Sequence, residues 1–210
     1  PPAYKGAATS GTGGMGYEPY DYYDLGEYNQ KGNTRTLFGT ASELIALISE
    51  AETLNLSVIA DIVVNHNNGG EKEFNPIVGA ETYTNFMNIA SSIFPRNYTH
   101  FHPCAYETAD QGQFLNFPDL CHAHPYVRSQ LLSWATWLSE EIGFQGWRFD
   151  NVVNFDPTFV EDWITTVGGF AVAEYWDGNV NNVMEYLDST GNSVMAFDFP
   201  LLYRLRQMAL

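Results

Sequence analysis

Apolar positions along the chain first become periodic in residues 40–54, where they recur every three or four residues, as on one face of a helix. Thr40 and Glu43 have the spacing of a capping box, so we expect this helix to begin at Thr40. The next run, over 56–64, is continuously apolar and rich in Val and Ile, which is typical of a strand buried on both faces of a parallel sheet. The regular part of the chain therefore opens with a helix and a buried strand.

The same alternation returns after residue 124. Pro125 and Pro157 stand where a first helical turn favours proline, and Asp156 is placed as an N-cap. The pattern predicts helices over 125–141, 157–167 and 181–188, and strands over 146–150, 170–175 and 194–199. Strands that alternate with helices indicate a parallel α/β sheet, here of four strands.

Two stretches lack this periodicity. Residues 1–39 are rich in Gly, Tyr and Pro and are predicted to be loop. Residues 66–121 lose all regular pattern and fill with Asn, Gly, Pro, His and aromatic residues. Because a structureless stretch of ~50 residues is improbable inside a compact domain, we expect this segment to be a functional insertion.

Composition narrows the classes of function. Hydrophobic residues make up 45% of the chain, as in globular proteins. The chain has 25 acidic and 9 basic residues and a net charge of −16, so nucleic acid and anionic membranes are poor partners. No apolar run approaches the ~20 residues of a membrane span. The acidity fits solubility, salt adaptation or cation binding, and the aromatic content of 15% includes many rings that could pack against sugars.

Polar side chains follow three of the predicted strands. They are Asp61, Asn65 and His66 after the first, Arg148 and Asp150 after the second, and Glu174 after the third. The carboxyl ends of parallel strands meet at one edge of a sheet, and in a (β/α)₈ barrel the active site lies there. We therefore expect these side chains to converge in space.

Several short motifs carry a family resemblance. They are Asp61-Ile-Val-Val-Asn65-His66, Phe117-Pro118-Asp119-Leu120, Gly146-Trp147-Arg148-Phe149-Asp150 and Ala173-Glu174-Tyr175-Trp176, with further similarity over 16–39. In this order and spacing the motifs resemble α-amylases of glycoside hydrolase family 13, most closely the archaeal type. The resemblance implies an α/β fold, a partial (β/α)₈ TIM barrel of about strands three to six. It divides the chain into barrel residues 1–65, an irregular inserted domain B over 66–121, and barrel residues 122–210.

The resemblance also assigns catalytic roles. It implies that Asp150 is the nucleophile and Glu174 the acid/base of a retaining glycosidase, whose two carboxyl groups stand about 5 Å apart. The two residues are 24 positions apart, which fits one strand–helix–strand unit. Arg148 precedes Asp150 by two residues, so it points to the same side of the strand and is expected to keep that carboxylate ionised. His66 is expected to hydrogen-bond the sugar, and Tyr17 to stack beneath it.

Metal sites follow from the resemblance as well. Calcium prefers hard oxygen ligands, and a structural calcium ion is implied to join the inserted domain to the barrel. Its ligands carried over by position are Asn65, Asp110, Asp119 and the backbone carbonyls of Gly112 and Asn154. Some archaeal members add zinc on two His and one Cys. Here His102 and Cys121 match, but Glu107 occupies the second His position, and Cys104 makes a Cys104–Cys121 disulfide an alternative.

The function implied is retaining endo-hydrolysis of α-1,4-glucosidic bonds in starch and malto-oligosaccharides by a secreted enzyme that is monomeric at full length. One alternative is a family 13 transglycosylase, which uses the same two carboxylates. Another is a non-catalytic barrel homologue that binds or scaffolds; such barrels typically lack the acids found here at 150 and 174.

The chain departs from the family pattern in three ways. Val153 and Asn154 stand where many members have a substrate-contacting lysine. The Asn-His-Asp motif that carries a third catalytic carboxylate after the seventh strand is absent from these residues, and so are the first two strands. We therefore expect residues 1–210 alone to be inactive and only weakly stable, because an open parallel sheet exposes apolar edges and faces.

Overall fold

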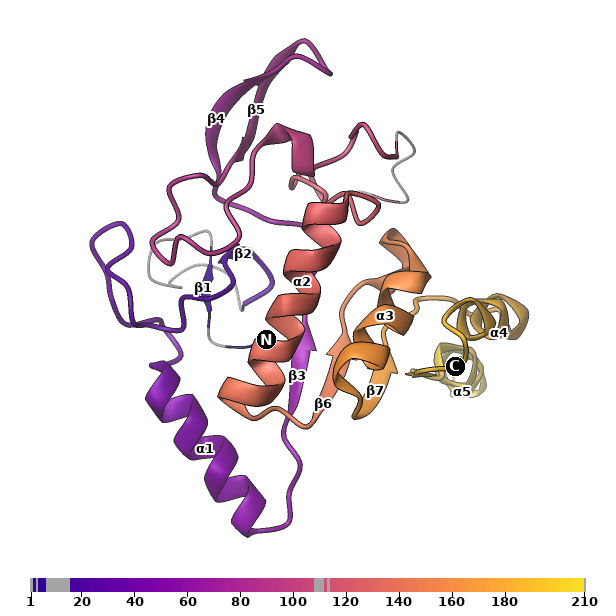
Figure 1. Ribbon diagram of the computed structural model, residues 1–210. Coiled ribbons are helices and arrows are strands. Elements are labelled where there is room, and N and C mark those ends of the chain that lie inside the picture. Colours follow the sequence, from indigo (N-terminus) through magenta and orange to yellow (C-terminus); the bar gives the residue numbers. More distant parts are fainter. Residues whose placement is uncertain (1, 3, 7–15, 108–111, 113, 210) are drawn as a thin grey trace.

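The computed structural model describes residues 2, 4–6, 16–107, 112 and 114–209 (Figure 1). A parallel sheet runs through its centre in the order β3-β6-β7-β8. These strands are β3 (Ile59–Ile62), β6 (Gly146–Phe149), β7 (Phe170–Ala173) and β8 (Met195–Ala196). The four predicted strands and their parallel arrangement are confirmed. Each regular strand is shorter than its predicted range.

Helices precede, connect and follow these strands along the chain. They are α1 (Ala41–Thr53), α2 (Pro125–Trp137), α3 (Pro157–Val167), α4 (Val180–Ser189) and α5 (Phe199–Met208). The predicted start signals are confirmed: Thr40 and Glu43 form the capping box of α1, and the Asp156 side chain accepts from Thr158 N at 2.9 Å to cap α3. Helix α2 continues into one π-helical turn, η3 (Leu138–Ile142), which ends at Gly143 with φ of 97°. Glycine tolerates this left-handed backbone without a Cβ clash.

Helices α2 and α3 lie side by side against the sheet (Figure 1). Trp163 of α3 meets Trp147 and Phe149 of β6 edge to face, with ring centroids 5.4 and 5.6 Å apart, and Trp134 of α2 joins at 5.8 Å. Successive residues of a strand point to opposite faces. Trp147 and Phe149 therefore pack under the helices, and Arg148 between them points to the opposite face. One strand thus supplies both the core and the site.

The expectation that residues 66–121 lack regular structure is wrong in part. The segment contains an antiparallel hairpin, β4 (Glu71–Asn75) with β5 (Ala80–Asn85), and a 3₁₀ turn, η2 (Tyr98–His100). The hairpin projects at the top of Figure 1. Polar contacts support the pairing of its two strands; Thr84 Oγ1, for example, donates to Glu73 at 2.7 Å. The strands therefore lack the alternation of apolar and polar residues by which a strand is predicted from sequence.

Residues 1–39 likewise contain a short antiparallel pair, β1 (Lys5–Gly6) with β2 (Pro19–Asp21), where we expected only loop. This region binds the inserted segment through buried polar groups. Arg96 is fully buried and donates to the carbonyls of Phe94 and Tyr20, both at 2.7 Å. Ser91 Oγ donates to the buried carboxylate of Asp21 at 2.6 Å. The two non-periodic stretches therefore fold against each other.

The sheet is open at both edges, β3 and β8. On the face opposite α2 and α3, Ile59, Phe170 and Met195 are 40%, 51% and 61% exposed, although such residues are usually buried. This matches the partial barrel that the sequence predicted. Among the described residues, none of the helices is both long and apolar enough to span a membrane.

Candidate active site

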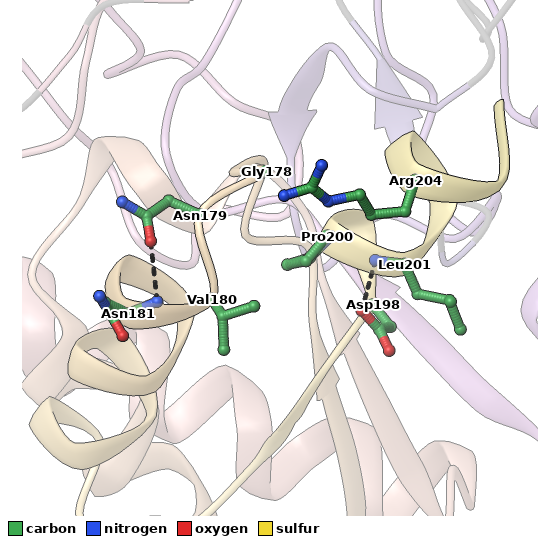
Figure 2. Close-up of a pocket in the computed structure, with 8 residues that line it drawn as sticks. All are labelled: Gly178, Asn179, Val180, Asn181, Asp198, Pro200, Leu201 and Arg204. Atoms are coloured by element: carbon green, nitrogen blue, oxygen red, sulfur yellow. Dashed lines mark hydrogen bonds between the residues drawn. The ribbon is translucent and has the colours of Figure 1, made fainter. Parts of the chain in front are cut away.

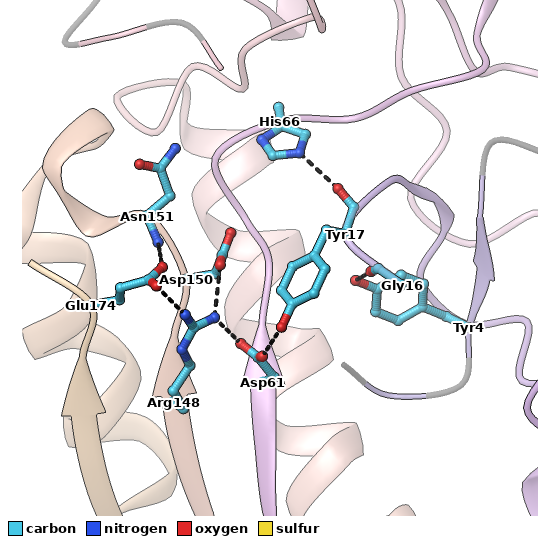
Figure 3. A network of polar contacts seen from close by, with 9 residues as sticks. All are labelled: Tyr4, Gly16, Tyr17, Asp61, His66, Arg148, Asp150, Asn151 and Glu174. Carbon is cyan, nitrogen blue, oxygen red and sulfur yellow. Dashed lines mark hydrogen bonds and ion pairs between the residues drawn. The ribbon is translucent and has the colours of Figure 1, made fainter. Parts of the chain in front are cut away.

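One arginine gathers three carboxylates at the carboxyl ends of the strands (Figure 3). Arg148 Nη1 lies 2.6 Å from Asp61 Oδ1 and 2.7 Å from Asp150 Oδ1, and Nη2 lies 2.6 Å from Glu174 Oε1. All four side chains come from neighbouring strands or from the residue that follows a strand. The convergence of Asp61, Arg148, Asp150 and Glu174 that the sequence predicted is therefore present in the structure.

The backbone fixes where the two acids point. Asp150 N donates to Ile62 O at 3.0 Å, and Glu174 N donates to Phe149 O at 2.9 Å, so the ladder continues one residue past the regular strands. This keeps the alternation of side chains intact. Asp150 consequently shares a face with Arg148, and Glu174 reaches the same guanidinium from the next strand.

The turn after Asp150 holds the second acid. Asn151 has φ of 50°, a left-handed conformation that Asn adopts more readily than most residues. Its backbone N–H donates to Glu174 Oε2 at 3.2 Å. Glu174 is thus held at one oxygen by Arg148 and at the other by the main chain of residue 151.

Burial sets the protonation of the site. It raises the pKa of Asp150 to about 6, and the negative charges of Glu174 and Asp61 act in the same direction, while Arg148 opposes the rise. Burial also raises the pKa of Tyr17 to about 12, so this phenol stays protonated and donates to Asp61 Oδ2 at 2.7 Å. The nucleophile candidate is ionised at neutral pH and sits close to its titration range.

A cavity of about 420 Å³ opens over these groups, which is within the range of small-ligand sites. Its lining residues are Tyr17, Phe114, Arg148, Asp150, Asn151, Glu174 and Trp176. Sequence reasoning did not select Phe114, Asn151 or Trp176 as site residues. Trp176 could have been found as a tryptophan two residues after the acid, and it is 56% exposed. Phe114 lies in the non-periodic segment, where no pattern marks it.

His66 lies behind the cavity wall rather than on it. Its side chain is buried, Nε2 is 2.9 Å from the backbone oxygen of Tyr17, and its ring stacks on Phe114 at 4.9 Å. Burial lowers the pKa of His66, which favours the neutral ring. In this conformation His66 supports Tyr17 and Phe114, two of the residues that line the cavity.

A larger cavity, of about 650 Å³, lies between the start of α4 and α5 (Figure 2). Two of its polar side chains serve as helix caps: Asn179 Oδ1 accepts from Asn181 N at 3.0 Å, and Asp198 Oδ1 accepts from Leu201 N at 2.8 Å. Asp198 is the single acid among the described residues that line it. Its size therefore does not make it the better candidate for catalysis.

The described positions expected to hold calcium lie in two pairs that each join the inserted segment to the barrel. Asn65 is fully buried, and its Oδ1 has no hydrogen-bond partner among the described residues. Asn65 O accepts from Leu120 N at 2.8 Å, next to Asp119. Gly112 lies so close to Asn154 that a Cβ there would overlap the Asn154 amide oxygen. This set of oxygen donors fits calcium; Asp110 lies outside the described residues.

The residues expected to hold zinc are joined differently. Cys104 and Cys121 form a disulfide, which was one of the alternatives open from the sequence. His102 lies beside them, with its ligand atom within 4.8 Å of both sulfurs. Zinc binds thiolates, and a disulfide supplies none. In this oxidised form the residues do not fit zinc.

Comparisons with known proteins agree on one family. The family model described as "Alpha amylase, catalytic domain" matches residues 9–206. The chain is 31% identical to a glucan 1,4-alpha-maltohexaosidase from Bacillus sp. (strain 707), covering 98% of this chain and 49% of the relative. It is 29% identical to the Bacillus licheniformis alpha-amylase, covering 97% and 49%. The chain thus spans about half the length of these relatives.

Solved structures support the fold. An alpha-amylase from Geobacillus thermoleovorans in complex with acarbose has a TM-score of 0.67 at 23% identity and covers 95% of this chain and 40% of its own. An alpha-amylase from Malbranchea cinnamomea has a TM-score of 0.66 at 23% identity, covering 96% and 41%.

Proposed function

Because the chain belongs to the alpha-amylase catalytic-domain family of glycoside hydrolase family 13, we propose that the whole protein is a retaining glycosidase that cleaves internal α-1,4 bonds of starch and malto-oligosaccharides. The observation that carries the proposal is the guanidinium of Arg148, which binds both Asp150 and Glu174 beneath one cavity. Two carboxyl groups on one cation, each at the end of a neighbouring strand, form a compact pair of the kind that retaining hydrolysis needs.

In the proposed reaction, the ionised Asp150 attacks the anomeric carbon and forms a glycosyl ester while the bond to the leaving oxygen breaks. Glu174 gives its proton to that oxygen, so the leaving sugar departs as an alcohol. Glu174 then takes a proton from water, which attacks the same carbon and releases Asp150 as a carboxylate. Arg148 keeps Asp150 ionised and fixes both acids. The ring of Tyr17 lines the cavity and is proposed as the platform beneath the sugar, with His66 supporting it.

We also propose a structural calcium ion on Asn65, Asp110, Asp119 and the carbonyls of Gly112 and Asn154. It would supply a fixed positive charge that joins the inserted domain, residues 66–121, to barrel residues 1–65 and 122–210. The buried, unpartnered Oδ1 of Asn65 supports this assignment.

The Cys104–Cys121 disulfide supports a secreted protein, because disulfides persist in oxidising compartments. One relative, 28% identical and from Escherichia coli (strain K12), is described as a cytoplasmic alpha-amylase, so membership of the family does not by itself fix the compartment. A non-catalytic scaffold is disfavoured, since both acids face an open cavity.

The test is hydrolysis by the full-length protein. Amylose should be cut internally, so viscosity should fall faster than reducing ends appear, and a β-1,4-glucan should remain intact. Proton NMR should show the α-anomer of the product first, because two displacements retain configuration. A first-formed β-anomer, or no cleavage of amylose, would reject the proposed function.

A further inference from the structure

Asn151 is placed between the two acids by its backbone. It follows Asp150 directly, lines the cavity, and donates its main-chain N–H to Glu174 Oε2 at 3.2 Å. The left-handed turn at φ of 50° fixes this placement. In Figure 3 the amide of Asn151 points away from the strands, to the side on which the Asp150 carboxylate also points. Its position is therefore set by the same turn that holds Glu174.

The side-chain nitrogen of Asn151 is unpaired among the described residues. Nδ2 is shielded from solvent and forms no hydrogen bond with any residue that the structure describes. Buried amide groups are normally satisfied, so such an exception in a cavity calls for a ligand or a role. The amide carries two donors and one acceptor and can turn about its Cβ–Cγ bond, so it can meet a hydroxyl in either sense. A sugar hydroxyl is a partner of this kind.

The position of Asn151 beside Glu174 indicates which sugar of the substrate its amide would contact. Glu174 must reach the oxygen of the bond that breaks, so groups around its Oε2 face the sugar that leaves. The backbone N–H of Asn151 donates to this oxygen, and Trp176, two residues beyond Glu174, lines the same cavity and is 56% exposed. The sugar that leaves occupies the place that an incoming acceptor sugar takes in transglycosylation.

We propose that the Asn151 amide binds a hydroxyl of the sugar on the leaving-group side, and so sets how well a sugar competes with water for the glycosyl enzyme. Asn151 acts on specificity and on acceptor choice, while the covalent steps belong to Asp150 and Glu174. This inference rests on the proposed function, since it assumes the α-1,4-glucan reaction.

The test uses Asn151→Gly in the full-length protein. Glycine accepts the left-handed backbone and keeps the N–H bond to Glu174, so only the amide is lost. The matched control is Asn192→Gly, because Asn192 also has a positive φ, 56°, but is exposed in the turn that follows α4. Two substrates are compared: maltopentaose, and an α-maltoside whose leaving group is 4-nitrophenol and carries no sugar hydroxyl.

Asn151→Gly should lower kcat/KM for maltopentaose about fivefold, as expected for one neutral hydrogen bond, and change the value for the nitrophenyl maltoside less than about twofold. The share of transglycosylation products at high maltopentaose should fall in parallel. Asn192→Gly should change neither. Asn151→Ala, which removes the amide without adding a charge beside Asp150 and Glu174, should repeat the selective loss, and it tests the inference if the glycine variant does not fold.

An equal loss on both substrates, or no loss on either, would overturn the inference while leaving the proposed function intact. If the unmodified protein cleaves neither substrate, the proposed function itself is wrong.

Discussion

Arg148 Nη2 lies 2.6 Å from Glu174 Oε1, so the acid/base candidate is anchored to the same cation as the nucleophile candidate. Replacing Glu174 with Gln keeps the shape but removes the ionisable proton. In the full-length protein we expect turnover of starch to fall by roughly three orders of magnitude or more, with the melting temperature nearly unchanged. Glu185→Gln, on the exposed face of α4, is the control. A Glu174→Gln variant that retains more than about a tenth of the activity rules out the assigned role.

The raised pKa of Asp150 predicts a pH profile. The nucleophile must be ionised, so kcat/KM should decline as pH drops through about 6. Arg148 holds this pKa down, so Arg148→Met should move the acid limb to higher pH as well as lower its plateau. Rates measured from about pH 4 to 9 give the acid limb and the plateau for both the unmodified protein and Arg148→Met. If the acid limb of Arg148→Met lies at the same pH as that of the unmodified protein, Arg148 does not lower the pKa of Asp150.

The raised pKa of Asp150 also predicts how stability depends on pH. Stability should fall as pH rises through this range, whereas kcat/KM should rise. A carboxyl group whose folded pKa lies above its ordinary 3.8 contributes stability that is fully present below about 3.8 and is lost as pH rises through about 6. Asp150→Asn mimics the protonated acid, so it should raise the melting temperature at about pH 7 and change it little at about pH 4. Calorimetry at the two pH values measures the difference, and a variant less stable at neutral pH refutes the prediction.

Ser91→Ala should destabilise the protein. Ser91 Oγ donates to Asp21 at 2.6 Å, and the Asp21 carboxylate is fully buried. A hydrogen bond to a buried charge contributes about 2 kcal/mol. Urea unfolding followed by circular dichroism should show a loss of that size, whereas Ser57→Ala, at an exposed position, should show almost none. Equal effects of the two changes would mean that the contact between segments adds nothing.

Calcium removal should loosen the inserted segment before the barrel. A ligand at a thousandfold excess over its Kd stabilises the folded state by about 4 kcal/mol. A chelator should therefore lower the melting temperature and direct the first proteolytic cuts to residues 66–121. Asp119→Ala should lower the melting temperature similarly and remove the response to chelator. If melting is unchanged after long incubation with EDTA, the calcium site is wrong.

Reduction of the disulfide offers a separate test of the cysteines. The Cys104–Cys121 bond closes a loop of 17 residues, which corresponds to about 3 kcal/mol of unfolding free energy. A reductant should lower the melting temperature of the unmodified protein, and the double variant Cys104→Ser/Cys121→Ser should be low from the start and insensitive to reductant. A reductant that leaves unmodified protein unaffected would argue that the bridge contributes no stability.

The sequence predicted those parts of the fold that depend on apolar periodicity or on local capping. The Thr40–Glu43 capping box and the strand at Gly146–Phe149 are examples, since each follows from residues a few positions apart. The hairpin of β4 and β5 was missed because polar cross-strand contacts stabilise it. The bond between Ser91 and Asp21 was also missed, because nothing in either local sequence points to a partner 70 residues away.

The active-site residues were predictable where they follow a strand pattern and not where they depend on the folded backbone. Charged residues after apolar strands located Arg148, Asp150 and Glu174, because the geometry of a parallel sheet brings strand ends together. The role of Asn151 was not predictable, since it depends on a backbone angle and on an unpartnered amide that only the folded chain reveals.

The bonds between the inserted segment and residues 16–35 have a consequence for the order of synthesis. Ser91 reaches back 70 residues to Asp21, and Arg96 reaches back 76 to Tyr20, so both partners exist before α2 has been translated. Asp61, by contrast, can pair with Arg148 only after a further 87 residues have been synthesised. At translation rates of about 5–20 residues per second this wait is on the order of ten seconds. On a ribosome, the inserted segment can therefore dock first, and the active-site network is completed later, when Arg148, Asp150 and Glu174 have been added.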